Sequence, residues 1–121
     1  MAPRVDGRNL LICGLGTDVL RGGAGQDILI GGTTNYDQNI TALRAIMNEW
    51  TRTDVDYATR IAQLNGSQSG GTNGAFLLNA TTVHDDGAAN TLFGGLDLDW
   101  FFVGLNDKTD QLKGEIATMV F

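Results

Sequence analysis

The sequence of 121 residues contains only one cysteine, one histidine and one proline. The single cysteine, Cys13, excludes an intrachain disulfide and a four-cysteine zinc site. Basic residues are also scarce, because 8 Lys and Arg stand against 14 Asp and Glu and give a net charge of −6. This balance argues against binding to nucleic acid or to an anionic membrane surface. Cations are the partners that such a charge favours.

Long apolar runs are absent as well. The apolar run near the N-terminus ends at Cys13, which is too early for the core of a secretory signal peptide, and no stretch approaches the length of a membrane span. We therefore expect no membrane insertion. If the chain is exported, it uses a route without a visible N-terminal signal or belongs to a longer protein, and whether Met1 is the native start stays open.

Glycine, in contrast, is abundant. The sequence contains 17 glycines, yet 42% of its residues are hydrophobic, which is too many for a solvated flexible linker. We therefore expect the glycines to serve a folded structure, and the length predicts a single domain over residues 1–121.

A nine-residue repeat accounts for many of these glycines. Residues 13–21 read CGLGTDVLR and residues 22–30 read GGAGQDILI, with aspartate at the sixth place and leucine at the eighth. The preceding segment, RVDGRNLLI, keeps the frame with Asn9 at the sixth place, whereas the following segment, GGTTNYDQN, keeps only the glycine pair. These segments form a first repeat block, residues 4–38.

The same frame returns in a second block, residues 85–111. It contains DDGAANTLF, then GGLDLDWFF with Asp99 at the sixth place, then the poorer match VGLNDKTDQ. A glycine-rich turn followed by a three-residue apolar strand is typical of a parallel β-roll or β-solenoid, in which stacking stabilises strands too short to be stable alone. Aspartates at a fixed place in every turn would repel one another unless a cation lay between them.

The repeat resembles the RTX, or haemolysin-type, calcium-binding nonapeptide G-G-x-G-x-D-x-(apolar)-x. GGAGQDILI matches it at every specified place, CGLGTDVLR departs only at Cys13, and GGLDLDWFF departs only at Asp97. The resemblance implies that turns 18 residues apart share Ca²⁺ through sixth-place carboxylates and backbone carbonyls. It places Asp18 opposite residues 31–37 and Asp27 opposite residues 4–9. The candidate metal ligands are Asn9, Gly14, Gly16, Asp18, Gly23, Gly25, Asp27, Asp37, Asp85, Asp86, Asp97 and Asp99.

The segment between the two blocks changes period. Apolar residues at helical spacing predict two helices within residues 39–66, the second beginning with a capping box at Thr53 and Asp56. Residues 67–84 are expected to form a loop and short strands, at 76–79 and 81–83, and residues 112–121 a tail. The fold class that we predict is mainly β: a short parallel β-roll with an inserted α-helical hairpin cap that packs on the open end or one face of the roll.

Three functions remain open. The first is a calcium-stabilised structural or terminal module of a secreted or cell-surface protein, with a homodimer through the ends of the roll as a further expectation. The second is a small metal-dependent enzyme that uses the acidic cluster around His84, Asp85 and Asp86, together with Asp97 and Asp99. The third is a metal-independent interaction module. A phosphate-binding loop at Gly14–Gly16 lacks the third glycine or alanine of the dinucleotide fingerprint, and a serine triad lacks a nucleophile elbow.

Overall fold

The computed structural model describes residues 7–120, and in this range the protein is mainly β-structure with two short helices. The helices are α1 (Ile40–Trp50) and α2 (Tyr57–Asn65). The strands, in chain order, are β1 (Leu10–Ile12), β2 (Val19–Arg21), β3 (Ile28–Ile30), β4 (Gly32–Thr34), β5 (Val83–Asp85), β6 (Thr91–Phe93), β7 (Trp100–Val103), β8 (Lys108–Thr109) and β9 (Ile116–Met119).

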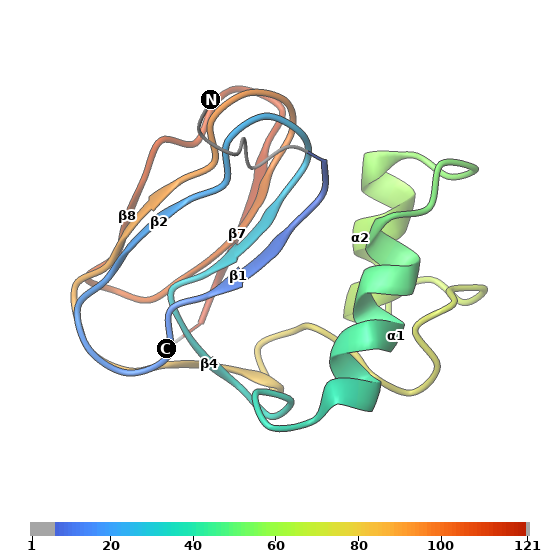
Figure 1. Ribbon diagram of the computed structural model, residues 1–121, viewed down its shortest axis with the longest axis horizontal. Helices are drawn as coiled ribbons and strands as arrows, with labels where there is room; N and C mark the ends of the chain where they lie inside the picture. Colours follow the sequence, from blue (N-terminus) through green and yellow to red (C-terminus); the bar gives the residue numbers. More distant parts are fainter. Residues whose placement is uncertain (1–6, 121) are drawn as a thin grey trace, which may run out of the picture.

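Two parallel sheets form the β part of the molecule. One has the strand order β1-β3-β7-β9 and the other the order β2-β6-β8, while β4 and β5 make a separate antiparallel pair. Apart from that pair, successive strands alternate between the two sheets, so the chain winds back and forth between them (Figure 1). Each strand is only two to four residues long and is stabilised by its neighbours in the stack.

The stack continues across the helical segment without losing its register. Leu10 pairs with Ile28, 18 residues later, whereas Ile28 pairs with Trp100 and Val19 pairs with Thr91, 72 residues later. Both separations are multiples of nine. The second repeat block therefore adds to the first in the same frame, and residues 31–84 leave the stack and return to it.

Strands β1, β3 and β7 present their side chains to two different cores. The middle residues point between the two sheets, where Leu29, Leu92 and Phe101 form a buried cluster. The flanking residues of the four-stranded sheet, such as Ile28 and Trp100, point outward and pack against the helical segment. The bulky run at residues 100–102 is thus divided between the inner core and the contact with the helices.

Both predicted helices are present and cover one face of the four-stranded sheet (Figure 1). Asn39 caps α1 by accepting a hydrogen bond from the Ala42 N–H. The capping box predicted for the second helix is wrong, because α2 begins at Tyr57 and Asp56 is itself the N-cap, bonded to the Thr59 N–H. The apolar stripes pack on the sheet face and not on an open end.

Three further local expectations were wrong. Residues 76–79 form no strand, and the strand expected at residues 81–83 is β5, which begins at Val83 and pairs with β4. Residues 112–121 are not merely a tail, since β9 pairs with β7 at the edge of the four-stranded sheet. Residues 4–6 of the first repeat block lie outside the described part of the chain.

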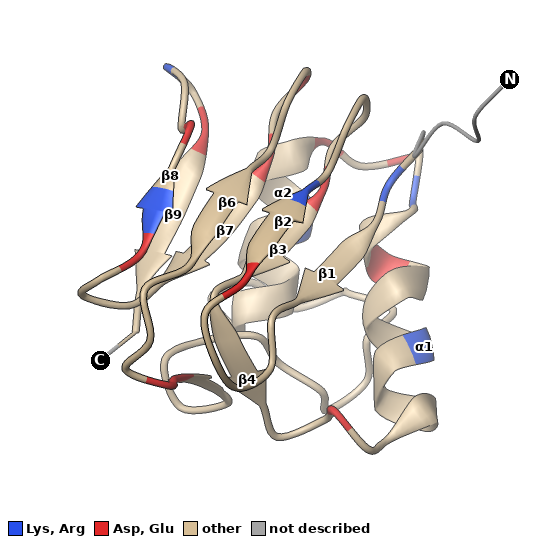
Figure 2. Cartoon of the chain, turned by 60° about the vertical axis from the view of Figure 1, so that its left-hand side comes forward, with Lys and Arg blue, Asp and Glu red and all other residues tan. Residues whose placement is uncertain are grey.

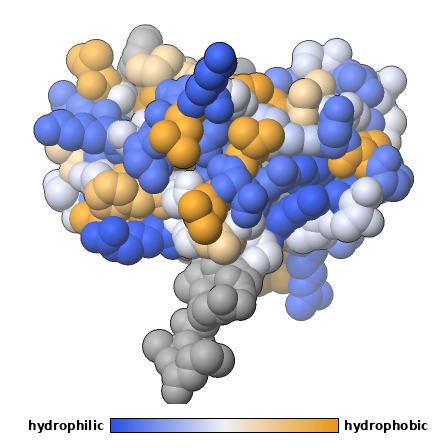
Figure 3. All heavy atoms as spheres, turned by 90° about the horizontal axis from the view of Figure 1, so that it is seen from above, coloured by the Kyte–Doolittle hydropathy of each residue, from blue (hydrophilic) through white to orange (hydrophobic). Residues whose placement is uncertain are grey.

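The surface of the molecule is mixed in polarity. Acidic residues gather in the turns at the ends of the strands (Figure 2). On the face seen in Figure 3, apolar side chains lie singly or in small groups among hydrophilic ones. Neither helix in residues 7–120 has the length and apolar character needed to cross a bilayer.

Candidate functional site

One row of mainly acidic side chains, which we call the acidic column, stands directly before the strands of the four-stranded sheet: Asn9, Asp27, Asp99 and Glu115. Each turn donates a backbone N–H to the side chain of the next. The N–H of Asn9 bonds Asp27 Oδ1 at 2.9 Å, that of Asp27 bonds Asp99 Oδ1 at 2.8 Å, and that of Asp99 bonds Glu115 Oε2 at 2.8 Å. The prediction that Asp27 faces Asn9 is therefore confirmed.

The turns at the opposite ends of the strands carry a second row, which we call the amide column: Asp18, Asn90 and Asp107. The ladder is the same, with the Asp18 N–H bonded to Asn90 Oδ1 at 2.8 Å and the Asn90 N–H bonded to Asp107 Oδ1 at 2.9 Å. Here the central member is an amide. Its Nδ2 donates to the Gly31 carbonyl at 3.0 Å and to Asp107 Oδ1 at 3.1 Å. Asn90 therefore satisfies both of its neighbours.

The acidic column has no such donor at its centre. Asp27 and Asp99 are fully buried, and Oδ2 of each has no hydrogen-bond partner among the described residues. Burial raises the pKa of Asp27 from 3.8 to about 6 against the lowering effect of its bonds to Asn9. Burial likewise raises the pKa of Asp99, with the neighbouring Glu115 and Asp27 adding to the rise. The column needs a proton or a cation to neutralise it.

The free oxygen of Asp27 lies close against Gly22. A Cβ atom placed on Gly22 would be 2.5 Å from Asp27 Oδ2 and 3.0 Å from the carbonyl oxygen of Gly94. Two acceptor oxygens thus approach the same face of Gly22, and only a residue without a side chain permits this approach. A carboxylate and a carbonyl are hard oxygen ligands of the kind that Ca²⁺ takes, and the residues here fit that ion better than a transition metal.

The glycines of the repeat and Asp97 shape these turns. Gly14, Gly16, Gly23 and Gly25 all have positive φ angles, between 73° and 95°. Asp97, in the place of a repeat glycine, also has a positive φ, of 71°. Its Oδ2 accepts the Gly25 N–H at 2.8 Å, which adds a second bond between neighbouring turns beside the acidic column.

The predicted partner of Asp18 was wrong. Gly14 does reach the expected loop through a hydrogen bond to the Gly32 carbonyl, but the N–H of Asp18 meets Asn90. Asp37 instead accepts two hydrogen bonds from Thr34 in its own turn. The reason is that the chain leaves the stack after Gly32, so the next turn of the column comes from the second repeat block.

The acidic cluster considered for an enzyme is divided in space. Asp86 lies near Cys13 beside the amide column, where burial and the charges of Asp18, Asp107 and Asp86 raise the pKa of the Cys13 thiol to about 12. Asp97 and Asp99 belong to the turns at the other ends of the strands. His84 Nε2 bonds Asn35 Oδ1 at 2.7 Å.

Asp85 and Asp86 each keep one carboxylate oxygen buried without a partner in the described part of the chain, Oδ1 in Asp85 and Oδ2 in Asp86. Both side chains are nevertheless partly exposed. Over residues 7–120, no three His, Cys, Asp or Glu side chains converge as a metal-binding group.

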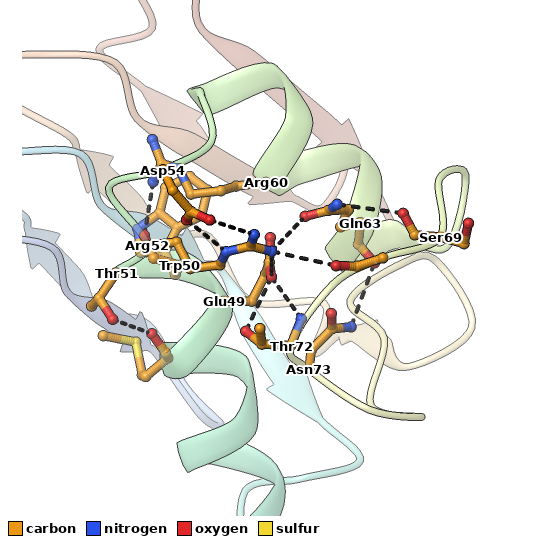
Figure 4. Close-up of polar contacts among 12 residues, drawn as sticks. Glu49, Trp50, Thr51, Arg52, Asp54, Arg60, Gln63, Ser69, Thr72 and Asn73 are labelled. Carbon is orange, nitrogen blue, oxygen red and sulfur yellow. Dashed lines mark hydrogen bonds and ion pairs between the residues drawn. The ribbon is translucent and has the colours of Figure 1, made fainter.

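A separate polar cluster lies on the helical segment (Figure 4). The Arg52 guanidinium bonds the buried Glu49 carboxylate at 3.0 Å and Asp54 at 2.9 Å, and it also reaches Gln63. Thr72 donates to the same Glu49 oxygen at 2.8 Å, which holds the glycine-rich loop against the helices. In this cluster an arginine already supplies the positive charge.

Three residues that the sequence reasoning missed are central to the site. Asn90 stands at the sixth place of DDGAANTLF and could have been noticed as the amide counterpart of Asn9. Glu115 lies outside the nine-residue frame, so no spacing signal identified it. Tyr57 contacts the column from α2, and its role depends on a tertiary contact that the sequence pattern does not reveal.

Comparisons of the chain with protein-family models, curated proteins and solved structures gave no significant match.

Proposed function

We propose that this chain is a calcium-binding β-roll module whose folding is stabilised by Ca²⁺ in the acidic column. The two parallel sheets with alternating strands form the roll, and the helical pair covers one face of it. The observation that carries the proposal is the fully buried Asp27 Oδ2, which has no hydrogen-bond partner among the described residues and approaches the same face of Gly22 as the Gly94 carbonyl oxygen.

The residues that would hold the ion come from turns that are distant in sequence. Asp27 and Asp99 would supply carboxylate oxygens, which lie against Gly22 and Gly94 respectively, and the Gly94 carbonyl would supply a backbone oxygen. An ion there would join the first repeat block to the second and thereby hold the helical segment between two fixed points. Because it binds the folded chain more tightly than the unfolded chain, it would raise stability by mass action.

The proposed setting is structural. A buried carboxylate pair that needs a cation suits a protein that works where free calcium is plentiful, and we place this module in a secreted or cell-surface protein. Extracellular calcium-binding modules have dissociation constants in the range of about 10⁻⁴ to 10⁻³ M. In that range the roll would be folded outside the cell and less stable in a calcium-poor compartment.

The test is calorimetric titration of the whole chain with CaCl₂ and, in parallel, with MgCl₂. We expect saturable Ca²⁺ binding that is lost in Asp27→Asn and retained in the matched variant Asp107→Asn, which changes the same residue type in the amide column. Equal loss in both variants, or no Ca²⁺ heat in the unmodified protein, would contradict the proposal.

A further inference from the structure

The helical segment is attached to the strands along the acidic column. Among the described residues, six hydrogen bonds join residues 39–66 to the stacked turns and strands, and all of them fall at or next to members of this column. Arg8, adjacent to Asn9, donates to the Trp50 and Arg52 carbonyls at 3.1 and 2.5 Å.

The helical segment also contacts the turn that carries Asp27. The Trp50 indole N–H donates to the Gln26 carbonyl at 2.8 Å, and the Arg60 guanidinium bonds the Gln26 side chain. Gln26 directly precedes Asp27, whose carboxylate is a proposed ligand. The two helices thus fix the backbone on which this carboxylate is mounted.

Tyr57 makes the most specific of these contacts. At four other steps the first N–H of a strand donates directly to the carbonyl of the column residue before the neighbouring strand, for example from Trp100 to Asp27 at 2.8 Å and from Thr91 to Asp18 at 2.9 Å. The equivalent bond from Ile116 to Asp99 is replaced by a relay. The Ile116 N–H donates to Tyr57 Oη at 2.9 Å, and Tyr57 Oη–H donates to the Asp99 carbonyl at 2.5 Å.

The relay stands where the acidic column is least satisfied. Asp99 carries the buried free Oδ2, and Ile116 directly follows Glu115, whose Oε2 accepts the Asp99 N–H. Tyr57 is 8% exposed and its ring packs edge-on against Trp50, so its hydroxyl is held in place by the core. The hydroxyl therefore sets the backbone positions of Asp99 and Glu115 from the helical side.

We propose that docking of the helical pair onto the stacked strands is coupled to cation binding in the acidic column, with Tyr57 as the positioning residue. This inference rests on the proposed function. Coupling is reciprocal: if docking of the helices organises the column, then occupancy of the column stabilises the docked helices. The ion would thus stabilise the docked position of α1 and α2, although neither helix supplies a ligand.

The test compares Tyr57→Phe with Tyr36→Phe in the full chain. Tyr36 is a matched control because its hydroxyl accepts the Leu77 N–H at 3.2 Å, far along the chain from the column. Calorimetric titration with CaCl₂ should show Ca²⁺ affinity reduced by about fivefold or more in Tyr57→Phe and unchanged in Tyr36→Phe. Thermal melts with and without EDTA separate this effect from a loss of stability common to both variants.

Two outcomes distinguish a failure of this inference from a failure of the proposed function. If the unmodified chain binds no Ca²⁺, the proposed function fails and the coupling fails with it. If the unmodified chain and Tyr57→Phe bind Ca²⁺ equally well, the coupling alone is wrong. Should Tyr57→Phe not fold, amide exchange of the unmodified chain decides: Ca²⁺ should slow exchange at Ile116 and in α2, and unchanged exchange there would overturn the inference.

Discussion

The acidic column and the amide column are built by the same repeat at opposite ends of the same strands, yet their central residues differ. In the amide column, Asn90 accepts one backbone N–H and its amide donates to two neighbouring oxygens. In the acidic column, Asp99 accepts an N–H in the same way but has no donor to offer in its ionised form. At the central position of each column, an amide is satisfied by its protein neighbours, whereas a carboxylate needs a proton or a cation.

This comparison also explains why Asn90 and Asp107 are satisfied without a ligand whereas Asp27 and Asp99 are not. Buried polar groups are normally paired, and an ionised carboxylate without a partner is costly. Asp107 meets the requirement with protein donors from Asn90 and Gly104. Asp27 and Asp99 do not, and their raised pKa values express that deficit as a preference for the protonated form.

The largest effect is expected from converting the amide column into a second acidic one with Asn90→Asp. Asn90 is 1% exposed, and the change removes both amide donors while placing a carboxylate beside Asp107. In EDTA the free energy of unfolding should fall by about 4 kcal/mol, because the buried Gly31 carbonyl loses its amide donor, Asp107 Oδ1 loses one of its two donors, and two like charges meet. Urea unfolding monitored by circular dichroism measures the change.

The reciprocal substitution, Asp99→Asn, is the control for that prediction. It should leave the EDTA stability unchanged or raise it, and it should remove the dependence of stability on Ca²⁺. If both substitutions lowered the EDTA stability by the same amount, the two columns would not differ in the way described.

The next effect in size is the pH dependence of the free energy of unfolding without a cation, which should be somewhat smaller than the effect of Asn90→Asp. The pKa of Asp27 is about 6 in the folded chain and 3.8 as its reference value, so the folded state holds the proton more tightly. The contribution of Asp27 to stability is then fully present below about pH 4 and is lost as pH rises through 6, by about 3 kcal/mol. Asp99, whose pKa is also raised, extends the loss to higher pH.

Saturating Ca²⁺ should abolish this loss, since the ion takes the place of the proton. Urea midpoints measured between pH 4 and pH 8, in EDTA and in CaCl₂, provide the comparison. Stability that rises with pH in EDTA would show that the buried carboxylates are satisfied by the protein itself.

Much of this architecture was predictable from the nine-residue frame. The positions of β1, β2, β3, β6 and β7 and the Asn9–Asp27 contact follow from the frame, because in-register stacking depends on equal spacing. Strand β8 departs from it, since Thr91 pairs with Lys108, 17 residues later. The helices followed from their apolar period. What could not be predicted is which turn meets Asp18, since the place where the chain leaves the stack is set by the β4–β5 pairing, a contact between distant segments.

The acidic column was predictable only in part for a similar reason. Asp27 and Asp99 stand at repeat positions, but Glu115 follows Asp99 by 16 residues and so lies outside the nine-residue frame, and Tyr57 joins the column from a helix. Both depend on three-dimensional packing that no local spacing encodes. The contrast between Asn90 and Asp99 is visible in the sequence, but its meaning requires the hydrogen bonds.

The most direct test of the account is the titration of the Asp27 carboxyl carbon by ¹³C NMR in the full chain, once in EDTA and once in CaCl₂. The account predicts a midpoint of about 6 in EDTA, and a midpoint below the reference value of 3.8 when Ca²⁺ is bound. The same midpoint near 3.8 in both solutions would contradict the claim that the acidic column is an unsatisfied carboxylate row that a cation completes.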